Sequence, residues 1–154
     1  MSKVLFVCLG NICRSPLAKG LATKIAEEKG MHERLFFDSC GTSHYHVGGP
    51  PDARTVENAK KNGLILNNIA RQFGKKDFRE FDFILAMDKD NMTNIKKLDQ
   101  SNEFAEKLFL MRDFDYIEAG GDVPDPYFGG EEGFQEVYEI LERSIKNFIE
   151  TKFD

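Results

Sequence analysis

The 154-residue sequence lacks several features that mark whole classes of protein. No apolar run approaches the ~18 residues that a membrane span needs, so we expect no membrane segment. The sequence has no stripe of lysine and arginine, and its formal net charge is -5, which disfavours a nucleic-acid-binding protein. It has only three cysteines, an odd number, which does not fit the disulfide framework of a small secreted domain.

The N-terminal apolar stretch is too short for a signal peptide. Residues 4–9 are followed by Gly10 and Asn11 rather than by a longer apolar region and a cleavage site. Together with the few cysteines, this predicts a reduced, cytoplasmic protein. The length and the ordinary composition, 41% hydrophobic and 31% charged, predict a single domain over residues 1–154. Nothing in the pattern demands a partner, so we expect a monomer.

Apolar runs and helical patterns alternate along the chain. The runs predict four strands, at residues 3–8, 35–39, 81–87 and 107–111. Apolar positions at three- and four-residue spacing predict helices over residues 15–30, 52–62, 92–98 and 134–148. This order predicts an α/β fold with three layers, in which a four-stranded parallel sheet is flanked by helices on both faces.

One segment combines residue types that suit phosphate chemistry. Residues 8–15, Cys-Leu-Gly-Asn-Ile-Cys-Arg-Ser, lie between the first predicted strand and the first predicted helix. At such a place backbone N–H groups and the positive end of the helix point at one spot, which fits a phosphate dianion. Gly10 and Asn11 tolerate the left-handed backbone of a tight anion-binding turn. The segment has no Gly-Lys-Ser/Thr sequence, which excludes a nucleotide P-loop.

The same segment predicts a nucleophile and the groups that serve it. The helix N-terminus and Arg14 favour the thiolate form of Cys8, which is the nucleophilic form. The planar guanidinium of Arg14 can hold two phosphoryl oxygens through the transition state. Ser15 can donate its hydroxyl to the Cys8 sulfur, both when the thiolate attacks and when it leaves. The spacing of Cys8 and Arg14 alone is weak evidence, but its place between a strand and Ser-Pro makes an inert buried cysteine the weaker interpretation.

The segment resembles the signature of the low-molecular-weight protein tyrosine phosphatases. Residues 7–16 match that signature nearly throughout. Further blocks similar to the family follow in the same order, at residues 41–43 with 48–52, 70–72, 81–88 and 125–127. The resemblance covers almost the whole chain. It implies hydrolysis of phosphotyrosine in proteins, and of small aryl phosphates, through a cysteinyl-phosphate intermediate on Cys8, without cofactor or metal. Phosphate and vanadate are then expected inhibitors.

The resemblance also implies a general acid. Asp125 lies in an Asp-Pro-Tyr motif, between two prolines that restrict where its side chain points. A carboxylic acid on a loop can protonate the leaving phenolate and then activate the water that hydrolyses the phosphocysteine. Taken alone, Pro-Asp-Pro is usually only a turn, so the role of Asp125 depends on the resemblance.

Aromatic and apolar side chains are expected to select the substrate. A deep aromatic slot favours phosphotyrosine over phosphoserine, because the tyrosine ring holds the phosphorus far from the backbone. The resemblance implies stacking by Tyr45 and Tyr127, and a floor and side formed by Leu9 and Ile12. Ordinary packing is the alternative for each, and for Phe128 the two stay equally open. The phosphate-binding set is completed by the loop residues Gly10, Asn11, Cys13 and Ser15.

Ile12 disfavours the protein-arginine phosphatase branch, which is similar to this family but carries threonine at the corresponding position. Cys13 can capture an oxidised Cys8 as a reversible disulfide, or it can pack as a small residue under the loop. Cys40 is expected to pack as a buried hydrophobe. His44 and His46 share a loop without a third ligand, so no metal site is predicted.

Two positions depart from the family pattern. Lys19 stands where most members have glutamate, and we expect a surface change on the first helix. Asn68 stands where many eukaryotic members have histidine, whose role is to support the catalytic loop through a hydrogen bond to the aspartate at Asp88. Asparagine can make such a bond but cannot titrate, which leaves Asp88 as a supporting residue.

Other functions share parts of this pattern. An arsenate reductase of the same fold needs further cysteines to pass a disulfide along, and residues 81–94 contain none. A phosphocysteine carrier needs neither Arg14 nor Asp125. A non-catalytic phosphotyrosine-binding module would have lost Cys8, Arg14 or Asp125, and all three are present.

Overall fold

The computed structural model describes residues 1–127 and 129–153. At its centre is a parallel four-stranded sheet in the order β2-β1-β3-β4. The strands are β1 (Ser2–Cys8), β2 (Leu35–Gly41), β3 (Phe83–Ala86) and β4 (Leu108–Leu110). The helices are α1 (Arg14–Glu28), α2 (Ala53–Lys61), α3 (Asp77–Glu80), α4 (Lys89–Lys96) and α5 (Glu131–Phe153), with 3-10 turns η1 (Ala105–Lys107) and η2 (Met111–Phe114).

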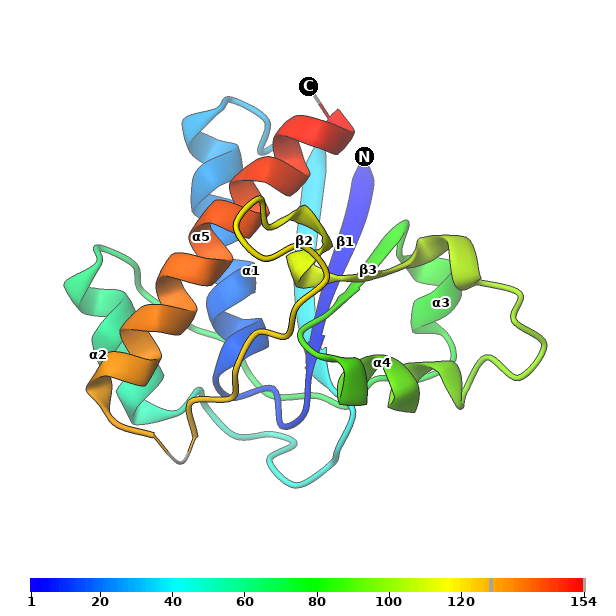
Figure 1. Ribbon diagram of the computed structural model, residues 1–154, viewed down its shortest axis with the longest axis horizontal. Coiled ribbons are helices and arrows are strands. Elements are labelled where there is room, and N and C mark those ends of the chain that lie inside the picture. Colours follow the sequence, from blue (N-terminus) through cyan, green and yellow to red (C-terminus); the bar gives the residue numbers. More distant parts are fainter. Residues whose placement is uncertain (128, 154) are drawn as a thin grey trace.

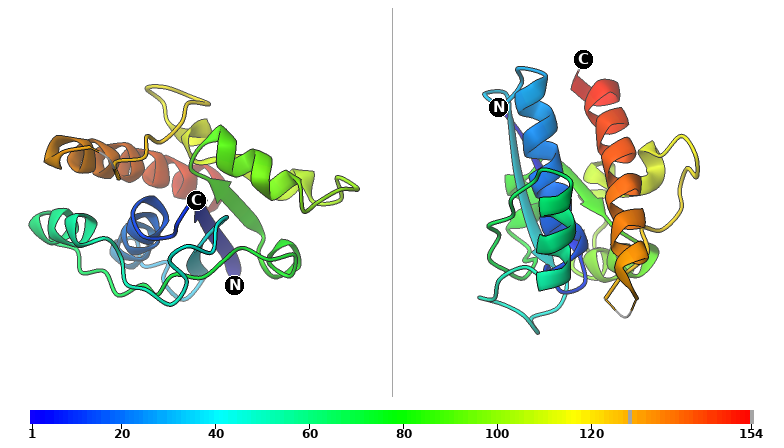
Figure 2. Two further views of the ribbon diagram at one scale, coloured as in Figure 1. Left: turned by 90° about the horizontal axis from the view of Figure 1, so that it is seen from below. Right: turned by 90° about the vertical axis from the view of Figure 1, so that its left-hand side faces the viewer.

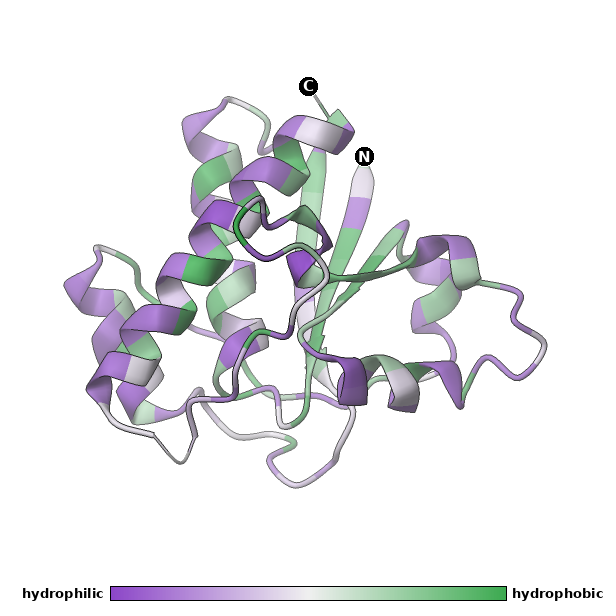
Figure 3. Ribbon diagram, viewed as in Figure 1, coloured by the Kyte–Doolittle hydropathy of each residue, from purple (hydrophilic) through white to green (hydrophobic). Residues whose placement is uncertain are grey.

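Helices cover both faces of this sheet, which confirms the predicted three-layer α/β fold. Helices α1, α2 and α5 lie on one side of it, and α3 and α4 lie on the other (Figures 1 and 2). The strands are the most consistently apolar elements, whereas the helices expose hydrophilic residues (Figure 3). Within the described part of the chain, no helix is both long and apolar enough to cross a membrane.

Strand β1 is buried on both faces because its side chains alternate between two cores. Val4, Phe6 and Cys8 belong to the core formed with α1 and α5. Leu5 and Val7 belong to the core on the opposite face, which α3 and α4 cover. A parallel strand in the middle of three layers has no polar face. The continuous apolar run read from the sequence therefore reflects this central position.

The predicted strands and helices occur in place, but several ends differ. Strand β2 continues beyond residue 39 because Cys40 and Gly41 still pair with the end of β1. Helix α3 was not predicted. It begins at the buried carboxylate of Asp77, which accepts hydrogen bonds from Arg71 at 3.1 Å and from the Gly74 N–H at 2.9 Å. These contacts are tertiary, so the spacing of apolar residues in the sequence does not predict them.

The carboxyl end of β1 lies at the point where the chain connections diverge to neighbouring strands on either side of β1. Strand β2 flanks β1 on one side and β3 flanks it on the other, and this divergence is the usual ligand site of an open α/β sheet. Segments that follow the neighbouring strands are tied to this end. The N–H of Thr42 donates to the Cys8 carbonyl, the N–H of Ser43 to the Leu9 carbonyl and the N–H of Met87 to the Val7 carbonyl, each at 2.9 Å.

A buried carboxylate ties η2 to α5. Asp115, directly after η2, accepts hydrogen bonds from Arg112 Nε at 2.8 Å and from Arg143 Nε of α5 at 2.9 Å. Burial raises the pKa of the Asp115 carboxyl, but hydrogen bonds from Arg143, the Ile117 N–H and Arg112 outweigh burial and lower the pKa to about 2. The charged form of Asp115 therefore stabilises the fold.

We expect Asp115→Asn to lower the free energy of unfolding at neutral pH by about 2 kcal/mol, because the charged hydrogen bonds weaken. The folded-state pKa lies below the value of about 3.9 for an unfolded aspartate, so this stabilisation is complete above about pH 5 and is lost as the pH falls toward about 2. Urea unfolding of both proteins across this range measures the effect. A difference between wild type and variant that stays constant on acidification would contradict the assignment.

Candidate active site

Residues 9–13, which we name the Cys8 loop, curl around the sulfur of Cys8 between β1 and α1. Asn11 adopts a left-handed backbone with φ of 58°. Asparagine is one of the few residues besides glycine that visits this region routinely. The turn directs the Asn11 N–H back to Cys8 Sγ at 3.3 Å. The Cys8 loop thus has the concave form of an anion-binding nest at a helix N-terminus.

Ser15 lies beneath the sulfur. Its Oγ is 3.0 Å from Cys8 Sγ, and both side chains are buried. Ser15 Oγ accepts a hydrogen bond from Asn11 Nδ2 at 2.7 Å. The hydrogen of Ser15 is therefore left for Cys8 Sγ or for the Cys40 carbonyl, which lies 3.2 Å away. This geometry allows Ser15 to donate to a thiolate at Cys8.

The Arg14 guanidinium is buried and held along one edge. Its Nη1 donates to Asp88 Oδ2 at 2.6 Å and to the Val123 carbonyl at 3.0 Å. Its Nη2 lies 3.5 Å from Asp125 Oδ2. Burial lowers the pKa of Arg14, but the negative charges of Cys8 and Asp88 outweigh burial and raise the pKa above its ordinary value. Arg14 therefore stays a cation of fixed orientation beside Cys8.

Asp125 stands on the long segment between η2 and α5. The N–H of Tyr127 donates to Asp125 Oδ1 at 3.1 Å, and the side chain of Asp125 is 38% exposed. The segment is anchored by the N–H of Val123, which donates to the Met87 carbonyl at 2.8 Å. This anchor brings a partly exposed carboxyl to the same side of the site as Arg14.

A cavity of about 220 Å³ opens above the Cys8 sulfur. It brings together most of the residues predicted for the site: Cys8, Leu9, Gly10, Ile12, Cys13, Arg14, Tyr45, Asp125 and Tyr127. The predicted Asn11 and Ser15 do not line the cavity, because their side chains are buried behind the backbone of the Cys8 loop. Tyr45 is 76% exposed and Tyr127 37%, so these rings stand at the mouth of the cavity rather than deep within it. Phe128 lies outside the described residues.

Ser43 and His46 also line the cavity. Ser43 falls in a block that resembles the family, whereas the sequence suggests for His46 only a metal-binding role, and a weak one. The His46 ring lies 6.4 Å from the ring of Tyr127, and its position beside Tyr45 was the signal that could have placed it at the cavity. Among residues 1–127 and 129–153, no three His, Cys, Asp or Glu side chains are grouped to hold a metal ion.

The other two cysteines are buried. Cys13 packs with Ile12, Ala70 and Phe134, and burial raises the pKa of the Cys13 thiol to about 12. Cys40 is inaccessible and packs in the α3–α4 core, as expected of a buried hydrophobe. Cys13 is therefore a neutral thiol beside the cavity, and capture of an oxidised Cys8 by Cys13 stays a prediction.

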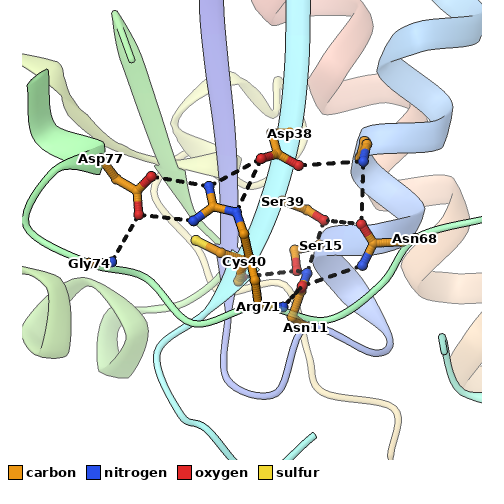
Figure 4. A network of polar contacts seen from close by, with 10 residues as sticks. Asn11, Ser15, Asp38, Ser39, Cys40, Asn68, Arg71, Gly74 and Asp77 are labelled. Carbon is orange, nitrogen blue, oxygen red and sulfur yellow. Dashed lines mark hydrogen bonds and ion pairs between the residues drawn. The ribbon is translucent and has the colours of Figure 1, made fainter. Parts of the chain in front are cut away.

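The amide of Asn11 is the centre of a polar network behind the Cys8 loop (Figure 4). Asn11 Nδ2 donates to Ser15 Oγ at 2.7 Å and to Ser39 Oγ at 3.0 Å. Asn11 Oδ1 accepts from the Arg71 N–H at 3.0 Å and from Asn68 Nδ2 at 3.4 Å. Asn11 is 1% exposed, so these bonds, rather than water, satisfy its amide.

Asp88 has the supporting role expected of it, through Arg14, but the contacts of Lys19 and Asn68 differ from those expected. Lys19 is not a simple surface change, because its Nζ lies 3.4 Å from both Asp38 Oδ1 and Asn68 Oδ1. Asn68 supports the loop through Asn11 and Ser39 rather than through Asp88, whose carboxylate binds Arg14. These side chains come from separate elements and meet only in the folded chain, so no local pattern could reveal the contacts.

These features define a class of α/β enzyme with a cysteine at the base of an anion-binding loop. The model of one family, described as "Low molecular weight phosphotyrosine protein phosphatase", matches residues 3–152. The low molecular weight phosphotyrosine protein phosphatase of Schizosaccharomyces pombe is 41% identical over 150 residues, which cover 97% of this chain and 96% of the relative. The chain belongs to the low molecular weight phosphotyrosine protein phosphatase family.

Solved structures share the fold. A crystal structure of a protein tyrosine phosphatase from Entamoeba histolytica, with Hepes in its active site, matches with a TM-score of 0.92 at 40% identity, covering 98% of this chain and 96% of the other. A Drosophila arginine phosphatase also matches with a TM-score of 0.92, at 30% identity, covering 99% of this chain and 98% of the other. The fold therefore does not decide the substrate. The residues that line the cavity must select it.

Two substitutions at Asn11 separate its backbone role from its amide role. We predict that Asn11→Gly, which keeps the left-handed turn but loses the amide, lowers kcat/KM for an aryl phosphate by about 100-fold, because the loop loses its alignment. Asn11→Ala should lose about tenfold more, because alanine resists this backbone. Steady-state kinetics measure both, with urea unfolding as a check on folding. Wild-type activity in the glycine variant would show that the amide is dispensable.

Proposed function

We propose that the protein is a protein tyrosine phosphatase that hydrolyses phosphotyrosine in proteins, and small aryl phosphates, through a cysteinyl-phosphate intermediate on Cys8. The observation that carries the proposal is the meeting of three groups at one cavity: Cys8 at its base, Arg14 beside the sulfur and Asp125 at the same end as Arg14. A binding module or a phosphocysteine carrier has no use for all three.

In the first step the Cys8 thiolate attacks phosphorus, so that a sulfur–phosphorus bond forms while the bond from phosphorus to the phenolic oxygen breaks. Loop N–H groups and Arg14 bind the phosphoryl oxygens, where charge spreads in the transition state. Asp125 in its protonated form gives its proton to the departing phenolate.

In the second step water attacks the phosphocysteine and Cys8 leaves as a thiolate. Asp125, now ionised, takes the proton of the attacking water. Ser15 donates its hydrogen to the sulfur, 3.0 Å away, as negative charge returns to it. Inorganic phosphate is released last, so phosphate and its analogue vanadate are proposed inhibitors.

The lining of the cavity favours an aryl phosphate. Tyr45 and Tyr127 at the mouth offer ring faces to a phosphotyrosine ring. Ile12 fills the position at which the arginine phosphatase branch carries a smaller threonine, and this bulk disfavours a phosphoguanidinium. We therefore place phosphotyrosine-containing proteins before phosphoarginine-containing proteins as partners. The expected cytoplasmic location, monomeric state, single domain and independence from cofactors are part of the same proposal.

Replacing the nucleophile tests the covalent route. We predict that Cys8→Ser abolishes release of phosphate from phosphotyrosine peptides while vanadate binding is kept, because the hydroxyl stays protonated but the loop N–H groups and Arg14 remain. Malachite-green assays measure turnover and calorimetry measures binding. Phosphoarginine peptides form the second arm of the assay. Retained activity in the variant would remove Cys8 as nucleophile, and faster turnover of phosphoarginine would reverse the substrate assignment.

A second substitution tests the general acid. We predict that Asp125→Asn slows hydrolysis of phenyl phosphate by roughly 10²–10⁴-fold, the usual size of a general acid–base contribution. The loss should shrink for p-nitrophenyl phosphate, whose leaving group needs less protonation.

The matched control is Asp122→Asn. Asp122 stands on the same segment, but its carboxylate accepts from the Lys89 N–H and does not line the cavity. This variant should keep activity within about twofold of wild type, because it leaves the reacting groups in place. Equal losses for both leaving groups in Asp125→Asn would exclude Asp125 as the acid.

A further inference from the structure

A chain of polar side chains runs from the Cys8 sulfur to the outer side of α1. Its consecutive members are Cys8, Ser15, Asn11, Asn68 and Lys19. Ser15 and Asn11 are fully buried and Asn68 is nearly so, whereas the Lys19 side chain is 31% exposed. Figure 4 shows the network around Asn11 and Asn68. In such a hydrogen-bonded chain each member can donate only where the next accepts. The orientation of one group therefore constrains the orientation of its neighbour.

The direction of the Asn11 amide is set by a backbone group. The Arg71 N–H can only donate, so the Asn11 atom 3.0 Å from it is the oxygen Oδ1. The nitrogen of the same amide then faces Ser15 and donates to it. Ser15 has only one hydrogen and already accepts this bond, so its own hydrogen points away from Asn11, toward Cys8 or the Cys40 carbonyl.

Lys19 sets the direction of the next amide in the same way. An ammonium group has three donors and no acceptor, so the Asn68 atom 3.4 Å from Lys19 Nζ is the oxygen. The nitrogen of Asn68 therefore faces Asn11 Oδ1, also at 3.4 Å. Ser39 Oγ, at 2.9 Å, contacts the same Asn68 oxygen. A hydroxyl can donate or accept, so Ser39 alone would permit either orientation of Asn68.

Lys19 is itself held in place by charge. Its ammonium lies 3.4 Å from Asp38 Oδ1, and the other oxygen of Asp38 binds Arg71, with Nε at 3.2 Å. Arg71 in turn makes a paired interaction with the buried Asp77, both bonds at 3.1 Å. Asp38 is thus fixed from the Arg71 side, and Lys19 fills the gap between this fixed carboxylate and the Asn68 oxygen.

We propose that Lys19 is a positioning residue for the Cys8 chemistry: it holds the Asn68 amide so that Asn68 Nδ2 donates to Asn11 Oδ1 beside the Arg71 N–H, and this second bond helps to keep the Ser15 hydrogen on the side of the sulfur. The inference rests on the proposed function, since it assigns Lys19 a part in that reaction.

The contact between Lys19 and Asn68 couples the residue types that these two positions can carry. Glutamate in place of Lys19 together with a charged histidine in place of Asn68 would put the acceptor on α1 and the donor at position 68, which reverses the polarity found here. Lys19→Glu alone would set a carboxylate against Asp38 and the Asn68 oxygen. The amide would then turn, and its oxygen would face Asn11 Oδ1.

The test compares single variants on α1. Lys19→Met keeps the apolar stem but loses the donors; we expect kcat for p-nitrophenyl phosphate to fall about tenfold, with KM within about twofold, because Lys19 does not line the cavity. Lys19→Arg keeps donors and should stay within about threefold of wild type. The matched control is Lys24→Met, on the same helix but outside the network, which should leave kcat unchanged.

A second readout needs no substrate. Alkylation of Cys8 by iodoacetamide, followed against pH, reports the thiolate directly. The charged groups facing Cys8, Arg14 and Asp125, are the same in all these variants. A profile displaced to higher pH by about one unit in Lys19→Met, and not in Lys24→Met, is the expected result. This readout stands even if wild type fails to hydrolyse phosphotyrosine, so failure of the proposed function and failure of the inference remain distinguishable.

A double variant with substitutions at positions 19 and 68 completes the test. We expect Lys19→Glu to lose more than Lys19→Met, and the double variant Lys19→Glu with Asn68→His to regain activity to within about threefold of wild type below pH 6, where histidine is charged. A merely structural lysine predicts additive losses instead. The inference is overturned if Lys19→Met and Lys24→Met behave alike in both readouts, or if the losses in the double variant simply add.

Discussion

The left-handed turn at Asn11 is the constraint on which the rest of the site depends. It directs the Asn11 N–H onto the Cys8 sulfur and at the same time turns the side-chain amide inward, away from the cavity. One residue thus shapes the concave inner side of the Cys8 loop and anchors its outer side to Ser15, Ser39 and Asn68. A glycine could make the turn but could not anchor it, which is the physical reason for an asparagine at this position.

The sheet supplies the frame in which this turn becomes useful. Because β1 is central, the segments that follow β2 and β3 can both be tied to its carboxyl end. The segment after β2 brings Tyr45 and Ser43 to the cavity, and the bond from Val123 to Met87 brings Asp125. Residues from distant parts of the chain therefore converge without any of them being near Cys8 in sequence.

The sequence predicts what depends on local pattern. The run of β1 and the apolar stripe of α5 reflect burial, and burial repeats with the period of the element. The residues around the cavity could be named because their motifs resemble a known family. Helix α3 and the contacts of Lys19 could not be predicted, because each depends on a partner that the fold alone brings within reach. Residues 19 and 68 lie on different elements, so their pairing leaves no periodic trace.

The carboxylate of Asp88 makes two contacts that link a helix to the active site. One of its oxygens accepts the N–H of Asn91 and so caps the first turn of α4, while the other holds Arg14. A single carboxylate thus begins a helix on one face of the sheet and aligns a cation on the other. Loss of this carboxylate consequently affects two places at once, because the first turn of α4 and the Arg14 guanidinium depend on the same side chain.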